Sequence, residues 1–248
     1  MKSAWKQLEH GYFKPWIRRW TRPLRFLLPW HTASFAGICV HYKRDLDGGG
    51  RTFGQDFIPF LKARGMPQQG RCFEWCARPA FIAFSLLGHR LCASICLADV
   101  NPKAVEACRR TIAANRLDGR ASVHLSDNLT HIPRSEQWDL VVSNPPHFAD
   151  EFENEIRSYD RDWHIHRGLF AAVGAHLKPN GVIILQENNR GSTAETFREM
   201  IEAAGFSIVF VDGCAPERTS KHRFYFIGIM RRGDTPPPWA TPTASPSH

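Results

Sequence analysis

The sequence lacks an apolar run long enough to cross a bilayer, which requires roughly 20 consecutive apolar residues. The nearest approach, at positions 24–40, is interrupted by Pro29 and His31. The basic start of the chain is too long for a secretory signal peptide, and the apolar stretch after it is broken by proline. These absences favour a cytoplasmic protein without a membrane partner.

The sequence also lacks the cysteine pattern of a disulfide framework or a zinc site. Its seven cysteines are odd in number and fall in segments that read as core elements, which favours free buried thiols. Cys72 and Cys76 are spaced CxxxC, as are Cys92 and Cys96, but no paired Cys or His half completes a four-ligand set. We therefore expect no bound metal.

What is present is the composition of one soluble α/β domain with an added segment: 248 residues, 43% hydrophobic and 23% charged. The net charge of +8 is concentrated at the start, where residues 1–25 hold seven Lys or Arg, one Glu and several tryptophans. This segment is either a surface for nucleic acid or membrane, or a helix whose tryptophans pack on the domain. We favour the second interpretation.

Downstream of position 70, strand patterns and helix patterns alternate, which predicts a parallel sheet covered on both faces. The final two strands have no helix between them, so the last one is expected to be antiparallel. The fold class is thus α/β, a Rossmann-like doubly wound seven-stranded sheet plus a short N-terminal helical segment. The predicted strands are 71–76, 93–99, 121–125, 138–142, 181–187, 207–213 and 223–231. The predicted helices are 79–88, 101–119, a segment including 166–177, and 192–205.

The boundaries follow from glycine and proline. Helices broken by proline are expected up to position 34 and strand character at 35–43, followed by a glycine-marked loop at 45–57 and a short helix at 57–65. Three parts result: a basic, aromatic N-terminal helical lid (1–45), the main domain (46–231), and a proline-rich tail (232–248) with the composition of disorder.

Polar residues mark the carboxyl ends of four predicted strands: Glu74, Asp99, Asp127 and Asn144. Ligands of doubly wound sheets bind beyond these ends. Three carboxylates and an amide at successive strand ends therefore outline a cofactor site.

Three segments carry a resemblance to a known family: "LADVNPKAVEACRRTIAANRL" (97–117), "SDNL" (126–129) and "DLVVSNPPHF" (139–148). They resemble the class I S-adenosylmethionine-dependent methyltransferases, in the branch with an Asn-Pro-Pro-aromatic motif. That branch includes release-factor glutamine methyltransferases and enzymes that act on exocyclic base nitrogens. The resemblance covers roughly residues 50–231 and implies S-adenosyl-L-methionine as the cofactor.

The resemblance also implies roles for individual residues. Asp99 would accept hydrogen bonds from the ribose hydroxyls, and Asp127 with Asn128 would lie near the adenine. The catalytic residues would be Asn144, Pro145, Pro146 and His147. The further cofactor-binding candidates are Phe53, Gln55 and Asp56 in a segment crossing the cofactor, Glu74, Cys76 and Arg78 after the first strand, and Val100.

The Asn-Pro-Pro motif suits methyl transfer to an amide or exocyclic amine. The Asn144 side chain and the Pro145 carbonyl can accept the two N–H hydrogens and so direct the nitrogen lone pair at the methyl group. The prolines make the turn stiff. His147 stands where the family has Tyr or Phe, and its ring could stack on a planar substrate or hydrogen-bond to it.

The first-strand motif departs from the family, which has three glycines after the acidic residue. Here Cys76, Arg78 and Ala80 occupy those places. Arg78 either pairs with the methionine carboxylate of the cofactor or fills the pocket with its bulk.

The expected function is N-methylation of a small metabolite or natural-product intermediate. The segment 149–162, with six acidic and two basic residues, would repel phosphates and so disfavours nucleic acid. Three alternatives stay open: methylation of RNA, DNA or a protein amide; another use of the cofactor, such as intramolecular cyclisation; and a cofactor-blocked, non-catalytic scaffold.

Overall fold

The computed structural model describes residues 30–47, 50–149, 159–213 and 224–241, and the backbone alone for residues 50–55. The predicted basic helices before position 30 and most of the acidic segment after the Asn-Pro-Pro turn lie outside the described residues. Within the described part, no helix combines the length and apolarity needed to cross a membrane.

The centre of the fold is a seven-stranded sheet with the order β5-β4-β3-β6-β7-β9-β8. The strands from β5 to β7 along this order are parallel, and β9 is antiparallel to both of its neighbours. This confirms the predicted doubly wound sheet. The strands are β3 (Gln69–Glu74), β4 (Cys92–Asp99), β5 (Ala121–Leu125), β6 (Trp138–Ser143), β7 (Leu177–Asn188), β8 (Phe206–Gly213) and β9 (Phe224–Arg231).

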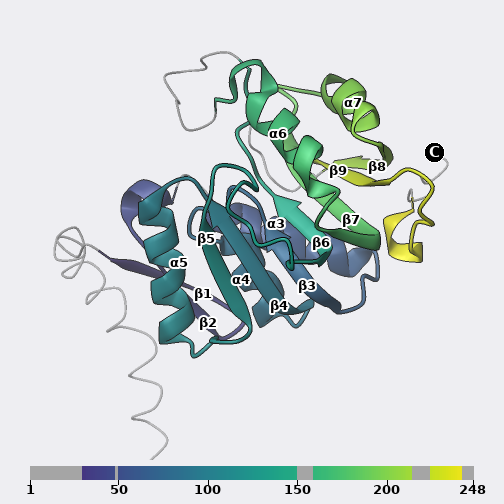
Figure 1. Cartoon of the computed structure of the whole chain (residues 1–248). Coiled ribbons are helices and arrows are strands. Elements are labelled where there is room, and N and C mark those ends of the chain that lie inside the picture. The colour runs from purple at the N-terminus through teal and green to yellow at the C-terminus, as the bar shows by residue number, and fades with distance from the viewer. Residues whose placement is uncertain (1–29, 48–49, 150–158, 214–223, 242–248) are drawn as a thin grey trace, which may run out of the picture.

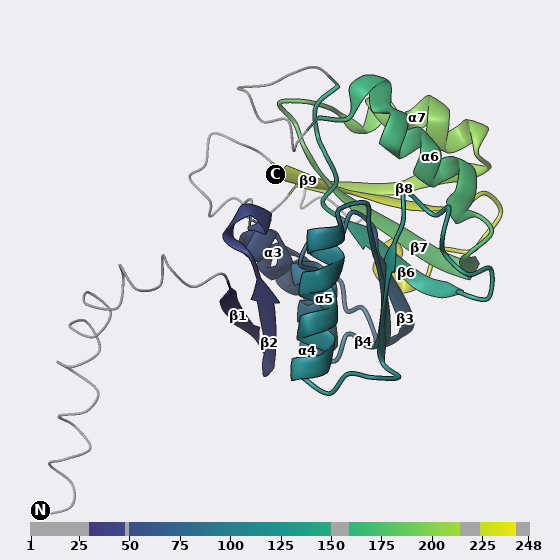
Figure 2. The same cartoon turned by 60° about the vertical axis from the view of Figure 1, so that its left-hand side comes forward.

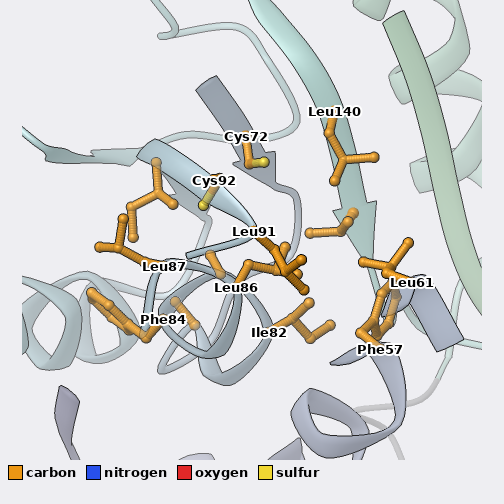
Figure 3. Close-up of a cluster of buried hydrophobic side chains, with 14 of the residues drawn as sticks. Phe57, Leu61, Cys72, Ile82, Phe84, Leu86, Leu87, Leu91, Cys92 and Leu140 are labelled. Atoms are coloured by element: carbon orange, nitrogen blue, oxygen red, sulfur yellow. The ribbon is translucent and has the colours of Figure 1, made fainter. Parts of the chain in front are cut away.

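Helices cover both faces of the sheet, as Figures 1 and 2 show. Each face has its own core. Phe57, Leu86 and Leu140 belong to the first (Figure 3), and Trp138 and Phe197 belong to the second. The first face carries α3 (Gly50–Ala63), α4 (Phe81–Gly88) and α5 (Pro102–Ala114), and the second carries α6 (His164–Val173) and α7 (Ala194–Ala203).

A hairpin lies outside α4 and α5 (Figure 2), formed by β1 (His31–Phe35) and β2 (Ile38–Tyr42). It confirms the strand character predicted for 35–43, but the predicted helix is wrong for residues 31–34. The turn residues Ala36 and Gly37 both have positive φ, 44° and 94°. Two such residues make a two-residue hairpin turn that matches the twist of its strands.

The hairpin is fixed to α5 through side chains. Asn115, which follows α5, accepts from the backbone N–H of Cys39 at 2.9 Å and donates to its carbonyl at 2.8 Å. Thr111 accepts from the backbone N–H of His41 at 2.9 Å. These bonds pair the backbone groups on the edge of β2 that faces α5. Polar contacts as well as apolar packing therefore hold the hairpin to the domain.

Two further predictions are wrong in part. The glycine-marked loop gives way to α3 at Gly50, because Phe57 and Leu61, both fully buried, lie one turn apart and anchor that helix in the core. The proline-rich tail is packed as far as residue 241. Trp239 is only 6% exposed, and its carbonyl accepts a hydrogen bond from Arg64 Nε at 2.9 Å.

Candidate active site

Several predicted site residues line an open cleft at the carboxyl ends of β3 and β6, where the strand order reverses. The cleft has a volume of about 390 Å³, open solvent included. Ligands of doubly wound sheets bind at this reversal. The walls include Leu46, Asp47, Glu74, Cys76, Arg78 and Asn144.

The turn after β3 has the backbone conformation of a glycine-rich loop without its glycines. Cys76, Arg78 and Ala80 have φ values of 52°, 49° and 58°. This left-handed region suits glycine, and a residue with a Cβ there costs roughly 1–2 kcal/mol. The turn therefore carries backbone strain and added side-chain volume at three positions whose conformation suits glycine.

Arg78 joins three segments around the cleft. Its backbone N–H donates to Asp99 Oδ2 at 2.7 Å, and its carbonyl accepts from the Cys108 thiol at 3.2 Å. Its Nη2 donates to the carbonyl of Asp45, after β2, at 3.4 Å in an exposed contact. The half-buried guanidinium thus reaches across the cleft rim instead of folding into the core.

Two carboxylates stand at the ends of β3 and β4. Glu74 is 3% exposed and accepts from the backbone N–H of Ala83, in the first turn of α4, at 2.6 Å. Burial raises the pKa of Glu74 to about 8. Asp99 accepts from the backbone N–H groups of Arg78 and Asn101 at 2.7 and 2.8 Å. These bonds lower the pKa of Asp99, but burial outweighs them and raises it. Each Asp99 oxygen retains a second lone pair for a ligand hydroxyl.

The two residues at the end of β5 differ in environment. Asp127 is exposed, as is Val100 after β4. Asn128 instead accepts from Trp75 Nε1 at 2.9 Å, and a Cβ at Gly168 would lie 2.4 Å from its Nδ2. The Asn128 amide therefore links the turn after β3 to α6. These contacts support a structural role for Asn128 more directly than a contact with the adenine.

Asn144 is half-buried at the end of β6, followed by buried Pro145 and half-buried Pro146. Its Nδ2 donates to Gln186 Oε1 at 3.0 Å, and Gln186 Nε2 donates to Asp56 Oδ2 at 3.4 Å. An ionised carboxylate only accepts, so the Asp56 contact favours the orientation of the Gln186 amide in which Oε1 faces Asn144. The Asn144 Nδ2 group is thereby engaged, and its Oδ1 acceptor lies on the side away from Gln186.

His147 belongs to a buried chain of four ionisable side chains. Its Nδ1 lies 3.2 Å from Glu187 Oε2, and Glu187 Oε1 lies 3.1 Å from His166 Nε2. His166 Nδ1 lies 2.6 Å from Asp160 Oδ2. Glu187, His166 and Asp160 are fully buried, and His147 is 7% exposed. The chain runs from α6 through β7 to the Asn-Pro-Pro turn.

The charges within this chain follow from the contacts. Burial lowers the pKa of His166, but Glu187 and Asp160 outweigh that effect and raise it to about 9. Burial raises the pKa of Glu187, and the His166 and His147 contacts bring it below its ordinary value. His166 is therefore an imidazolium between two carboxylates. His164, two residues before His166, is exposed.

Gln186, Glu187 and His166 were not expected at the site. The strand at 181–187 ends in the polar pair Gln-Glu, which is the same signal that identifies Glu74 and Asp99 at their strand ends. His166 carries no such signal, because its partner Glu187 is remote in the sequence.

The side chains of Phe53 and Gln55 lie outside the described residues, although both positions belong to α3.

Cys96, His124 and Glu136 offer ligand atoms within 4.8 Å of one another, the arrangement of a metal site. Arg71 already binds both oxygens of Glu136, at 2.6 and 2.7 Å. A guanidinium at that distance opposes a second cation, so the group is a poor metal centre.

Residues 66–206 match the family model described as methyltransferase small domain. The release factor glutamine methyltransferase of Cereibacter sphaeroides is 28% identical over 143 residues, which are 52% of this chain and 50% of that protein. The ribosomal RNA small subunit methyltransferase C of Actinobacillus pleuropneumoniae is 32% identical over 126 residues, 51% of this chain and 35% of that protein.

The solved structure of the T. thermophilus 16S rRNA N2 G1207 methyltransferase, in complex with AdoMet and guanosine, is similar in fold. The TM-score is 0.55 at 16% identity, over 80% of this chain and 49% of that one. The chain spans half or less of the length of the curated relatives named above. The family model covers more than half of the chain, and the chain therefore belongs to the methyltransferase small domain family.

Proposed function

We propose that this chain transfers a methyl group from S-adenosylmethionine to a nitrogen atom. The observation that carries the proposal is the oriented Asn144 amide on the wall of the cleft, with Nδ2 engaged by Gln186. Family membership and the relatives named as methyltransferases support it.

The residues around the cleft fit S-adenosylmethionine. Asp99, fixed by two backbone N–H groups, would hold the ribose hydroxyls. Exposed Asp127 would accept from the adenine amino group, and Arg78 would pair with the methionine carboxylate. The left-handed turn at Cys76 gives the backbone the path needed for close approach. When bound, S-adenosylmethionine supplies an electrophilic methyl group on its sulfonium sulfur.

The protein's part in the reaction is to position the acceptor nitrogen. The Asn144 Oδ1 and Pro145 carbonyl oxygens would accept both hydrogens of a planar –NH2 group. Its delocalised lone pair then points toward the methyl group. Two successive prolines, each with a fixed φ, limit the motion of these acceptors.

The acceptor we propose is a small metabolite or natural-product intermediate. The relatives favour a second candidate, since they are named for glutamine of a release factor, ribosomal RNA and a tRNA adenine. Incubation with tritiated S-adenosylmethionine and three fractions of a cell extract separates these classes. Label in the small-molecule fraction supports the first candidate, and label in protein or RNA supports the second. The Asn144→Ala variant should transfer label to none of the three fractions.

Cofactor binding is tested by calorimetric titration with S-adenosylmethionine and S-adenosylhomocysteine. We expect micromolar binding that Asp99→Ala abolishes. Absence of binding by the native chain, restored by Arg78→Gly, would indicate a built but obstructed pocket and a non-catalytic scaffold. Consumption of bound cofactor without label in any acceptor would indicate a different use of it, such as cyclisation.

A further inference from the structure

Methylation of a neutral nitrogen that carries hydrogen releases a proton, and the Asn-Pro-Pro turn has no group to take it. The Asn144 amide oxygen and the Pro145 carbonyl accept hydrogen bonds but are not bases at physiological pH. His147 is the first ionisable side chain after them in the sequence. An imidazole changes its charge within the physiological range, which suits it to receive this proton.

We propose that His147 is the base that takes the proton from the acceptor nitrogen, and that Glu187, His166 and Asp160 are positioning residues that hold its ring. The proposal rests on the proposed methyl transfer to nitrogen. It assigns to His147 a proton-transfer role, beyond the stacking or hydrogen bonding expected from the sequence.

The contact with Glu187 fixes the tautomer of His147. Glu187, as a carboxylate, only accepts hydrogen bonds, so the His147 Nδ1 atom 3.2 Å away carries the hydrogen. The lone pair of the neutral ring is then on Nε2, at the opposite edge. A carboxylate behind a histidine in this way fixes its orientation and stabilises the imidazolium that forms after proton transfer.

The surroundings of the His147 ring are rigid. The rings of Phe148 and Phe224 contact His147 edge-on, with centroids 6.3 and 5.7 Å away. A Cβ added to Gly191 would lie 2.1 Å from the His147 carbonyl oxygen, so the loop after β7 clamps the turn. A ring held in this way reorganises little when a proton arrives.

The charge of the buried group also favours a proton on His147. Imidazolium His166 between Asp160 and Glu187 leaves this buried group with a net charge of −1. A proton on His147 brings that charge to zero. Burying three ionised groups opposes stability unless their contacts offset the loss of water, so a chain of this kind favours a role beyond folding.

Other ionisable groups lie close to these four buried side chains. Tyr225 pairs with Glu187 across β7 and β9, shares a hydrogen bond of 3.0 Å with Ser192, and has a pKa raised by burial. Removal from water and the carboxylates Asp99, Asp160 and Glu187 raise the pKa of the Cys76 thiol. Both groups therefore stay neutral through the range in which His147 would act. Arg190 is three residues beyond Glu187 on the following loop.

The step balances as follows. The nitrogen lone pair forms the bond to the methyl carbon, and the sulfur keeps the electron pair of the broken S–C bond. The nitrogen is then cationic, and one of its two hydrogens turns from the Pro145 carbonyl to His147 Nε2. That N–H bond breaks, its electrons return to nitrogen, and the proton binds Nε2. Release of that proton to water restores the neutral ring.

Sinefungin tests the proposal without a known acceptor, because a carbon bearing an amino group replaces the sulfur and methyl of the cofactor. Calorimetry would measure its affinity relative to S-adenosylhomocysteine from pH 6 to 9. We expect the native chain to favour sinefungin and to lose that preference as the pH falls and His147 gains a proton. His147→Phe should reduce the preference by about tenfold, the size of one charged hydrogen bond, and make it independent of pH. Its affinity for S-adenosylhomocysteine should be unchanged.

The matched control is His164→Phe, an exposed position on the same segment, which should alter neither ligand's affinity. An undiminished preference for sinefungin in His147→Phe, with S-adenosylhomocysteine still bound, would overturn the role of His147 alone. Absence of S-adenosylhomocysteine binding by the native chain would overturn the proposed function as well. Nitrogen NMR of histidine-labelled protein adds a direct check: neutral His147 with its hydrogen on Nε2 would also contradict the proposal.

Discussion

At the scale of single residues, the site depends on which atom of an amide faces the acceptor. The Asn144 Nδ2 group donates to two acceptors of Gln186, the side-chain Oε1 at 3.0 Å and the backbone carbonyl at 3.5 Å. The backbone carbonyl only accepts, and the Asp56 carboxylate adds to this preference by accepting from Gln186 Nε2, which leaves Oε1 facing Asn144. A charged residue on α3 thus contributes to the orientation of the amide at the end of β6.

Asp56→Asn tests this chain of amides. An asparagine can donate to Gln186, which allows both Gln186 and Asn144 to reverse and to present Nδ2 to the acceptor. We expect methyl transfer to slow by roughly 10²-fold, the usual effect of losing one oriented group at a reacting centre, with S-adenosylhomocysteine affinity unchanged. The measurement is the initial rate of label transfer, with exposed Asp118→Asn as control. A native rate in Asp56→Asn would show that the amide orientation does not depend on Asp56.

Sequence alone located Glu74, Asp99 and Asn144, because polar residues at the ends of apolar strands must meet at one edge of a parallel sheet. It did not predict that Cys76 and Arg78 adopt a left-handed backbone. Local preference opposes that conformation for residues with a Cβ, so the surrounding structure must impose it.

At the scale of elements, α4 and α5 end in the same way. Arg90 and Arg116 follow the last turns with φ of 59° and 54°, and the backbone N–H of the next residue reaches back five positions, from Leu91 to Leu86 and from Leu117 to Ile112. This is the helix-ending motif in which glycine is strongly preferred. Both arginines are exposed, so their side chains add little packing.

Arg90→Gly and Arg116→Gly should therefore each stabilise the protein by about 1 kcal/mol, since glycine removes the strain of a Cβ in the left-handed region. Chemical denaturation measures the change. The controls are Arg90→Ala and Arg116→Ala, which keep the Cβ and should give no gain. A glycine variant no more stable than its alanine counterpart would contradict this explanation.

Elements with long apolar patterns were predicted well, and the misses have local causes. The hairpin was missed at residues 31–34 because its turn uses Ala36 beside Gly37, and alanine is an unusual choice at positive φ. The start of α3 was missed because three consecutive glycines indicate a loop. The burial of Phe57 and Leu61 overrides that preference, and it is visible only once the sheet is assembled.

At the scale of the whole molecule, the buried chain should make stability depend on pH. The folded-state pKa of His166, about 9, lies above its ordinary value of 6.5. The folded protein therefore binds this proton more tightly than the unfolded chain. The resulting stabilisation is complete below pH 6.5 and is lost as the pH rises through 9. Free energies of unfolding, measured by urea denaturation between pH 6 and 9.5, should fall over this window.

His166→Gln removes the titrating group and should flatten that decline, whatever its effect on absolute stability. His164→Gln, on the exposed side of α6, is the control and should keep the native slope. An unchanged slope in His166→Gln would mean that His166 is not protonated between its carboxylates.

The tail contributes to the molecule as a whole. Trp239 inserts into the core of the α3 face, and Arg64 holds its carbonyl while pairing with Asp212. Trp239→Ala should destabilise the protein by about 3–5 kcal/mol, as for other large buried aromatics. Thermal unfolding would measure this, with Trp239→Phe expected to retain most of the stability. A loss below about 1 kcal/mol would indicate that the tail is not part of the folded core.

The parallel direction of most strands and the antiparallel last strand were predictable because alternating strands and helices permit few arrangements. The proline-rich composition of the tail concealed one large apolar residue whose partners, Arg64 and the α3 face, are distant in the sequence. The composition of the tail reflects its many prolines and does not show the contacts of a single residue. It therefore indicated disorder, although the tail is packed as far as residue 241.

The decisive measurement is a crystal structure of the native chain with S-adenosylhomocysteine and sinefungin bound in turn. The ribose hydroxyls should meet Asp99, the amino-acid part should cross the turn at Cys76 and Arg78, and the sinefungin amino group should lie within hydrogen-bond distance of Asn144 Oδ1. A ligand bound elsewhere, or an Arg78 side chain filling the cleft with no ligand in it, would contradict methyl transfer at this site.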